Sequence, residues 1–475
     1  MTHESFKKIC FEVAKNNLPL AVGGVHVSND VTRIKKEIPQ IDYIFVREAD
    51  NNFPQFIEAV NTKKINETSI GGVLLKYDGN NWYNFDSYSI PTEDEISQMP
   101  AYELIEDLED YSKYGMIGSF YWLKGENTKA GTILSNRGCR AQCSFCSVRN
   151  FNGKGVRRRH VESVVDELSY LKNERGLNHF MFLDDDLFKD EKQTIAMFDE
   201  IVRRKLKITW DATNGVIAYA CTPEVIHAAY ESGCIGINLG MESGNPEILK
   251  KIRKPGTVKN FIKAAETCRQ YQEIVTSVFL IIGFPNENMS KILDTIEVAR
   301  EMDLDWCRTQ VLQPLPNTPI YQEMLDAGLI SDDEQKGRFT VGSYGRARNE
   351  DDDRRFRDHD PKKAFEDINL SSIPSKQQLS DIWFYMDFHL NYKRLLNENR
   401  KIKLVQQKKM LERIANVNSL NNGFALYFLA VIYKKQNLSI PKSIIKKLQK
   451  VYSNDNYWGS KLHQFGLSIS DLDKI

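Results

Sequence analysis

Short apolar runs alternate with amphipathic helical patterns through the middle of the chain. Six runs have the length and composition of buried strands, and segments with helical periodicity, such as 161–174 and 192–204, follow most of them. Strand-then-helix repetition is typical of a parallel sheet covered by crossover helices. We therefore predict an α/β protein with a partial barrel of six strand–helix units. The six runs are 132–134, 180–183, 208–210, 236–239, 276–282 and 308–312.

The first hundred residues carry a different pattern. An apolar helical face precedes an apolar strand at 18–22, and this strand ends in a Gly-Gly pair. A helix at 31–38, a second strand at 41–46 and a hairpin at 71–83 follow. A complete doubly wound domain opens with a strand and a glycine-rich turn before its first helix. We therefore expect an incomplete Rossmann-like unit, which the chain enters partway through.

Two segments have the composition of connections between these parts. Residues 89–102 combine two prolines with acidic side chains, and residues 346–357 are dense in aspartate and arginine. From Ser375 onward the apolar spacing is helical, with few strand signals. The barrel is therefore expected to lie between an incomplete Rossmann-like domain and a helical C-terminal domain. The predicted domains are 1–95, 96–345 and 346–475.

Composition narrows the functional classes. The chain has 475 residues, and Lys plus Arg and Asp plus Glu number 64 each, so the formal net charge is zero. A neutral chain lacks the basic footprint of backbone binding, so no obligate nucleic-acid partner is expected. No apolar run approaches the roughly 20 residues that span a bilayer, and charges interrupt the N-terminus where a secretory signal would be apolar. We expect a cytoplasmic protein that does not enter a membrane.

Three of the eight cysteines lie within eight residues. Cys139, Cys143 and Cys146 directly follow a predicted strand, and in a reducing cytoplasm such thiols favour metal ligation over disulfides. Three thiolates on one loop can bind three corners of a 4Fe-4S cubane and leave the fourth iron open. A zinc site is an alternative, although structural zinc needs four ligands and only His160 is close in sequence. Three buried structural thiols are a further alternative.

This cysteine spacing, after a strand that opens a strand–helix repeat, resembles the radical S-adenosylmethionine (SAM) superfamily. Further segments of the family pattern follow in order over roughly residues 130 to 320. The last of them departs from the family's Pro-Gly-Thr-Pro by an asparagine in place of the glycine. These segments are Phe145, Asp185-Asp186, Glu242-Ser243-Gly244, Gly283-Phe284-Pro285 and Pro316-Asn317-Thr318-Pro319.

The resemblance implies how this chain would contact SAM. Phe145, Gly283 and Pro285 are expected near the adenine, and Glu242 and Ser243 near the ribose and methionine part. No side chain is assigned a catalytic role at this point.

The acidic pair Asp185 and Asp186 has two interpretations. The resemblance places it at the end of the second barrel strand, where it would face the cofactor. The same two residues could instead cap the next helix. The family's Gly-Gly-Glu, which serves the methionine amino group, does not occur in this chain.

The resemblance also implies the chemistry. SAM would chelate the open iron, and one electron from the reduced cluster would break its S–C5′ bond. The resulting 5′-deoxyadenosyl radical would abstract a hydrogen atom from a small-molecule substrate. An electron donor such as flavodoxin or ferredoxin is the implied protein partner.

The N-terminal unit resembles the second half of the cobalamin-binding domain that precedes many of these barrels. Gly23 and Gly24 stand where the family's glycine pair lets the cofactor's nucleotide tail approach the backbone. The Asp-x-His-x-x-Gly loop that carries the family's cobalt ligand does not occur in the sequence, and His26 is interpreted as a turn residue. Cobalamin-dependent methyl transfer or rearrangement and cobalamin-independent radical chemistry therefore both stay open.

A hypothesis from a different functional class is that the protein is a non-catalytic scaffold that binds an iron–sulfur cluster or zinc. Its helical tail, with aromatic residues between 383 and 388, would then bind a partner, although this spacing also fits a plain core. Formation of 5′-deoxyadenosine from SAM would distinguish the enzyme hypotheses, which require it, from the scaffold hypothesis.

Overall fold

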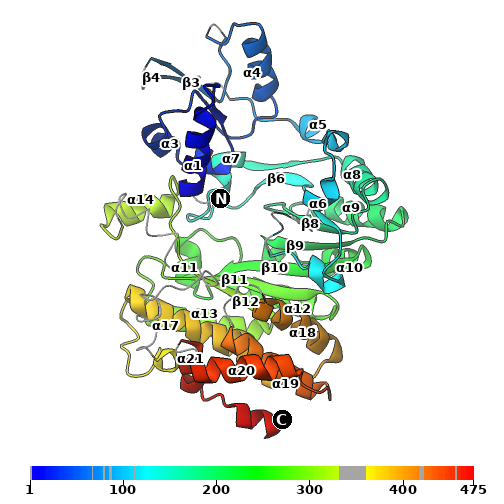
Figure 1. Cartoon of the computed structure of the whole chain (residues 1–475), viewed down its shortest axis with the longest axis vertical. Helices are drawn as coiled ribbons and strands as arrows, with labels where there is room; N and C mark the ends of the chain where they lie inside the picture. The colour runs from blue at the N-terminus through cyan, green and yellow to red at the C-terminus, as the bar shows by residue number, and fades with distance from the viewer. Residues whose placement is uncertain are drawn as a thin grey trace.

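The computed structural model of the chain has three parts in sequence order. Figure 1 shows the N-terminal unit (dark blue) at one end, the six-stranded sheet in the middle and the C-terminal helices (orange and red) at the other end. Within the described part of the chain, every helix is too short or too polar to cross a bilayer. The charged stretch 346–357, predicted as a boundary, lies outside the described residues. These are 3–474 without 67, 79–80, 85–87, 112–113, 115, 117, 331–359, 417–421 and 455–456.

The central sheet contains six parallel strands in the order β12-β11-β10-β9-β8-β5. All six predicted strands are present, so the predicted fold class is confirmed. The strands are β5 (Ala130–Ile133), β8 (His179–Phe182), β9 (Thr209–Val216), β10 (Cys234–Glu242), β11 (Val275–Ile282) and β12 (Trp306–Val311). The helices that follow them are α8 (Val161–Asn173), α9 (Glu191–Arg203), α10 (Pro223–Glu231), α11 (Pro246–Lys251), α12 (Val258–Arg269), α13 (Met289–Met302) and α14 (Pro319–Asp326).

The amino ends of the strands are closed by packing. Gly236 on β10 leaves room for the ring of Phe120, since a Cβ there would lie 2.2 Å from that ring. The buried carboxylate of Asp211 on β9 accepts hydrogen bonds from Ser119 Oγ at 2.6 Å and from Phe120 N at 2.7 Å. The interior at this end is therefore filled by side chains. The opposite, carboxyl end is where open space remains for a ligand.

The N-terminal unit is a small mixed sheet with helices on it. β1 (Ala21–Val22) pairs in parallel with β2 (Tyr43–Phe45), and β3 (Val73–Asp78) and β4 (Asn81–Asn84) continue the sheet in antiparallel order. The predicted strands, helix and hairpin all occur here, and β1 lies at the edge of the sheet. The helices are α1 (His3–Ala14), α2 (Val25–Asn29), α3 (Val31–Glu37) and α4 (Asn52–Asn61), followed by α5 (Glu93–Ile96) and α6 (Leu108–Tyr111).

The C-terminal helices cover the free edge of β12. Asn391 accepts a hydrogen bond from Cys307 N at 2.7 Å and donates one to Cys307 O at 2.9 Å, as a neighbouring strand would. Phe384 and Phe388 are buried in the core that these helices share, so the aromatic spacing belongs to packing and not to a partner surface. The helices are α17 (Lys376–Met386), α18 (Lys401–Asn416), α19 (Gly423–Lys435), α20 (Lys442–Asn454) and α21 (Trp458–Gln464).

Candidate active site

Cys139 ends the first strand of a short hairpin that follows β5. β6 (Asn136–Cys139) pairs antiparallel with β7 (Gly155–Arg158), and Cys139 lies opposite Gly155. Gly138 has a φ of +91°, and a Cβ there would lie 2.5 Å from the carbonyl oxygen of Gly155. Only glycine therefore fits beside this cysteine.

The other two cysteines lie on the loop between the hairpin strands, ahead of α7 (Val148–Asn152). Cys146 N donates to Cys143 O at 3.2 Å, which closes a turn. Ser144 N donates to Ile252 O at 2.9 Å, and Ile320 N donates to Ser144 O at 3.0 Å. The cysteine loop is thus tied to the segment after α11 and to the start of α14.

Asp184 fixes the start of the hairpin. Its buried carboxylate accepts hydrogen bonds from Ser135 Oγ at 2.5 Å, from Ser135 N at 3.1 Å and from Asn136 N at 2.7 Å. Burial raises the pKa of Asp184 to about 6, although these hydrogen bonds pull it downward. Asp184, the first aspartate of the run 184–186, therefore holds the start of the cysteine strand in place.

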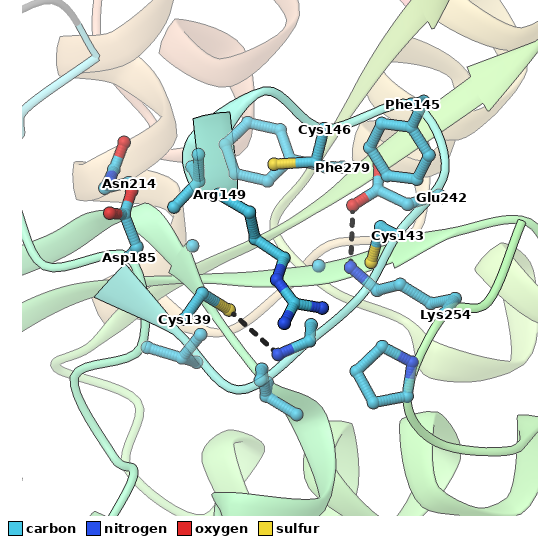
Figure 2. Close-up of a pocket in the computed structure, with 17 residues that line it drawn as sticks. Cys139, Cys143, Phe145, Cys146, Arg149, Asp185, Asn214, Glu242, Lys254 and Phe279 are labelled. Atoms are coloured by element: carbon cyan, nitrogen blue, oxygen red, sulfur yellow. Dashed lines mark hydrogen bonds and ion pairs between the residues drawn. The ribbon is translucent and has the colours of Figure 1, made fainter. Parts of the chain in front are cut away.

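A cavity of about 220 Å³ opens where the carboxyl ends of the strands meet the cysteine loop. All three predicted cluster cysteines line it, together with three of the predicted cofactor contacts, Phe145, Asp185 and Glu242. Figure 2 shows that these side chains come from different segments yet surround one space. The remaining charged, aromatic and amide residues of its wall are Arg149, Asn214, Lys254 and Phe279.

The donor set of this cavity fits an iron–sulfur cluster better than a single zinc ion. Burial raises the pKa of Cys139 to about 11 and that of Cys143 to about 12, and a bound metal cation would reverse this preference for the thiol. Around one zinc, thiolate sulfurs lie roughly 3.8 Å apart, as Zn–S bonds near 2.3 Å require. Among the described residues, the three thiols do not form a group whose ligand atoms all lie within 4.8 Å of one another, so they are spread more widely than the ligands of one zinc.

Glu242 projects from a break in β10. The pairing of β10 with β11 shifts register between Gly240 and Glu242, and Glu242 has a φ of +69°, which is rare outside glycine. Its carboxylate forms an ion pair with Lys254 Nζ at 2.9 Å. Burial alone would lower the pKa of Lys254, but Glu242 and the thiol of Cys143 raise it, and the net direction is upward. The cavity wall thus carries a charged pair of opposite sign.

The predicted acidic pair divides between two roles. Asp185 lines the cavity and accepts a hydrogen bond from Asn152 Nδ2 at 2.9 Å, while burial raises its pKa to about 6. Asp186 is not on the cavity wall and binds Arg140 through two bonds, of 2.7 Å and 2.8 Å. Neither residue caps α9, because Asp190 accepts the hydrogen bond from Gln193 N at 2.9 Å.

Three further predicted contacts are not on the cavity wall. Ser243 Oγ lies 3.2 Å from Thr295 Oγ1, which anchors the end of β10 to α13. Gly283 begins a turn whose backbone is bound by Glu287, with Gly283 N to Glu287 Oε2 at 2.6 Å. The carbonyl of Pro285 accepts a hydrogen bond from Lys251 Nζ at 3.0 Å.

Neither glycine of the N-terminal pair Gly23-Gly24 lines this cavity. Gly24 has a φ of +93° and precedes α2, and a Cβ on it would meet nothing within 4 Å among the described residues. His26, on α2, lies 3.0 Å from the ring nitrogen of His3, so its side chain is held by another histidine.

Lys254, Arg149, Asn214 and Phe279 were not predicted from sequence. Asn214 and Phe279 lie in the last half of β9 and β11, so the rule that barrel sites form at the carboxyl ends of strands could have found them. Lys254 lies on the segment after α11, and no local pattern marks it. Its role depends on the tertiary contact with Glu242.

Comparisons with known proteins agree with this geometry. The sequence profile described as the Radical SAM superfamily matches residues 133–299. An uncharacterized methyltransferase of Pyrococcus horikoshii is 30% identical over 322 residues, which are 67% of this chain and 66% of that protein. The anaerobic magnesium-protoporphyrin IX monomethyl ester cyclase of Cereibacter sphaeroides is 26% identical over 68% of this chain and 51% of its own length. The chain thus spans about half to two thirds of these relatives.

Solved structures share the fold. The cobalamin-dependent SAM radical enzyme OxsB, with aqua-cobalamin and SAM bound, has a TM-score of 0.59 at 14% identity and covers 99% of this chain and 73% of its own. The radical SAM methyltransferase TsrM of Kitasatospora setae has a TM-score of 0.57 at 19% identity and covers 68% of this chain and 61% of its own. The profile match, the relatives and the fold together show that this chain belongs to the radical SAM superfamily.

Proposed function

We propose that this chain is an enzyme that cleaves SAM reductively at a 4Fe-4S cluster bound by Cys139, Cys143 and Cys146, and that its reaction is a cobalamin-dependent methyl transfer. The observation that carries the first part is the set of three thiols that line one cavity together with charged and aromatic side chains. The names of the relatives support the second part, since the Pyrococcus horikoshii protein and TsrM are both described as methyltransferases.

When bound, the reduced cluster supplies the electron that breaks the S–C5′ bond of SAM and so yields a 5′-deoxyadenosyl radical. The residues of this chain would bind and orient the parts. Lys254 and Glu242 offer opposite charges suited to the carboxylate and ammonium groups of an amino acid. Phe145, packed 6.1 Å from Phe284, offers an apolar surface suited to a nucleobase.

A small-molecule substrate and an electron donor such as flavodoxin or ferredoxin complete the proposal. We place the protein in the cytoplasm, because the eight cysteines are free thiols and a reducing compartment preserves them. Catalytic roles for single side chains are not assigned, since the substrate decides them.

The cluster is tested by anaerobic reconstitution of the full chain. We expect about four irons per chain and the broad absorption of a 4Fe-4S cluster in the wild type. Cys143→Ala is expected to lose most of this iron, because each of three ligands is needed to hold the cubane. Cys10→Ala is the matched control, since Cys10 is equally a free thiol but lies buried in the N-terminal unit. Equal iron in both variants would contradict the proposed ligands.

One observation favours a second candidate, a radical enzyme that works without cobalamin. The described N-terminal sheet has a single parallel strand pair, β1 with β2, and β1 lies at its edge. Titration of the full chain with hydroxocobalamin separates the candidates. A shift of the corrinoid absorption bands on binding supports the cobalamin-dependent reaction, and free-solution bands at saturating protein support the second candidate.

A further inference from the structure

One buried carboxylate joins the N-terminal unit to the cysteine hairpin. Glu48 follows β2, and its side chain is only 4% exposed. Its carboxylate is bound by both Nη atoms of Arg157, with Nη1 to Oε2 at 2.8 Å, and by Arg137 Nη1 at 3.1 Å. Asp50 accepts from the same nitrogen of Arg137 at 2.8 Å. Two carboxylates of one unit thus neutralise two guanidinium groups of the other.

The two arginines are direct neighbours on the hairpin. The register of β6 and β7 places Arg137 opposite Arg157. Like charges directly opposite each other destabilise an antiparallel strand pair, and a guanidinium group cannot lose its proton. The hairpin therefore carries a repulsion of its own, which Glu48 offsets. Cys139 lies two residues beyond Arg137 on the same strand, so the conformation of this strand sets the place of the thiol.

The backbone of Glu48 is held in place by Tyr88. The Tyr88 hydroxyl accepts from Glu48 N at 3.0 Å and donates to Glu48 O at 3.2 Å. A second contact joins the same unit to the other end of the cysteine loop, where Asn150 on α7 donates to Asn29 Oδ1 at 3.1 Å. The N-terminal unit therefore contacts both flanks of the loop that carries the three cysteines, and its helix α2 lies against α7.

We propose that Glu48 is a positioning residue for the cysteine loop: it bridges Arg137 and Arg157 and so holds the hairpin in the conformation that presents Cys139. The N-terminal unit then has a task that does not depend on cobalamin, namely to stabilise the cluster site. This inference rests on the proposed function, because it takes Cys139 as a cluster ligand.

The test measures iron loss from the reconstituted full chain under an excess of chelator. In Glu48→Gln, which keeps the shape but not the charge, we expect iron loss at least about tenfold faster than in the wild type, because a buried ion pair is broken. In the double variant Glu48→Gln/Arg137→Gln, removal of one arginine relieves the repulsion, and the rate is expected to return to within about threefold of the wild type. Glu37→Gln is the matched control, since Glu37 binds Arg33, Lys7 and His3 inside the N-terminal unit.

A second measurement needs no cluster. Hydrogen–deuterium exchange of residues 136–139 and 155–158 in the apoprotein should rise in Glu48→Gln, fall back in the double variant and stay unchanged in Glu37→Gln. A double variant at least as impaired as Glu48→Gln, or an equal effect of Glu37→Gln, would overturn the positioning role. A wild type that binds no iron would contradict the proposed function alone, because the exchange measurement still tests Glu48.

Discussion

The cavity at the carboxyl end of the barrel and the Gly23-Gly24 turn were both predicted to hold a cofactor, yet they are built differently. Around the cavity, the charged side chains are held by neighbours, as Asp184 is by Ser135 and Glu242 is by Lys254. At the turn, a Cβ on Gly24 would meet nothing within 4 Å among the described residues. A site whose side chains are held by their neighbours is preorganised for its ligand. The turn instead offers exposed backbone, so a ligand there would have to make its other contacts elsewhere.

The largest effect should come from the glycine beside the first cysteine. In Gly138→Ala, the new Cβ would lie 2.5 Å from the carbonyl of Gly155 at a φ of +91°. We expect the hairpin to distort and the bound iron to fall at least about tenfold, since strain and overlap each cost on the order of 1–3 kcal/mol. Iron content after reconstitution measures this, and unchanged iron would contradict the preorganised hairpin.

The next effect concerns the charged pair of the cavity wall. Lys254→Met leaves the Glu242 carboxylate without its partner, where the two side chains are 9% and 10% exposed. We expect the free energy of unfolding to fall by about 3 kcal/mol, because an unpaired buried charge is left behind. The double variant Glu242→Gln/Lys254→Met should recover part of this loss in urea unfolding. A single variant as stable as the wild type would show that water already solvates the pair.

A pH-dependent effect is expected at the turn after β11, where Glu287 binds the backbone of Gly283. Burial raises the pKa of Glu287 from 4.5 to about 7, so the folded chain favours its protonated form. Ionisation of Glu287 therefore opposes folding: the cost is absent below about pH 4.5 and complete above about pH 7. Glu287→Gln keeps an oxygen for Gly283 N and Phe284 N. The free energy of unfolding of Glu287→Gln, relative to the wild type, should rise by up to about 3 kcal/mol between about pH 4.5 and 7. A difference between the two proteins that stays constant over this pH range in urea unfolding would contradict this account.

The smallest effect is expected at the exposed turn. Among the described residues, a Cβ in Gly24→Ala meets no overlap, and the φ of +93° opposes the substitution. We expect a loss of about 1 kcal/mol in the stability of the N-terminal unit, from backbone strain alone. Iron retention should stay at the wild-type level, which makes this variant the counterpart of Gly138→Ala. Loss of iron in Gly24→Ala would show that the turn and the cluster site are coupled more tightly than their contacts indicate.

The local sequence pattern predicted the strands and helices well, because their periodicities depend on residues that are close together in the sequence. The run predicted at 276–282 is β11 without its first residue, and the helix predicted at 161–174 is α8 with one residue more. Local pattern could not separate Asp185 from Asp186, since alternation in direction, together with the position of Arg140, decides which carboxylate faces the cavity.

The residues that support the site were harder to predict. Asp184 is the neighbour of two predicted residues, but its partners Ser135 and Asn136 lie about fifty positions away. Lys254 meets Glu242 only because β10 breaks its register there. Glu48 binds arginines from another unit of the chain. Such contacts depend on the tertiary fold, and no spacing in the sequence encodes them.

The most direct test of the central claim is the formation of 5′-deoxyadenosine from SAM by the anaerobically reconstituted chain with a chemical reductant. The wild type should form 5′-deoxyadenosine whenever cluster, SAM and reductant are all present, and Cys143→Ala should form none above the background of SAM and reductant alone. Equal amounts of 5′-deoxyadenosine from Cys143→Ala and the wild type, or none from a wild type that holds about four irons per chain, would contradict reductive SAM cleavage at these three cysteines.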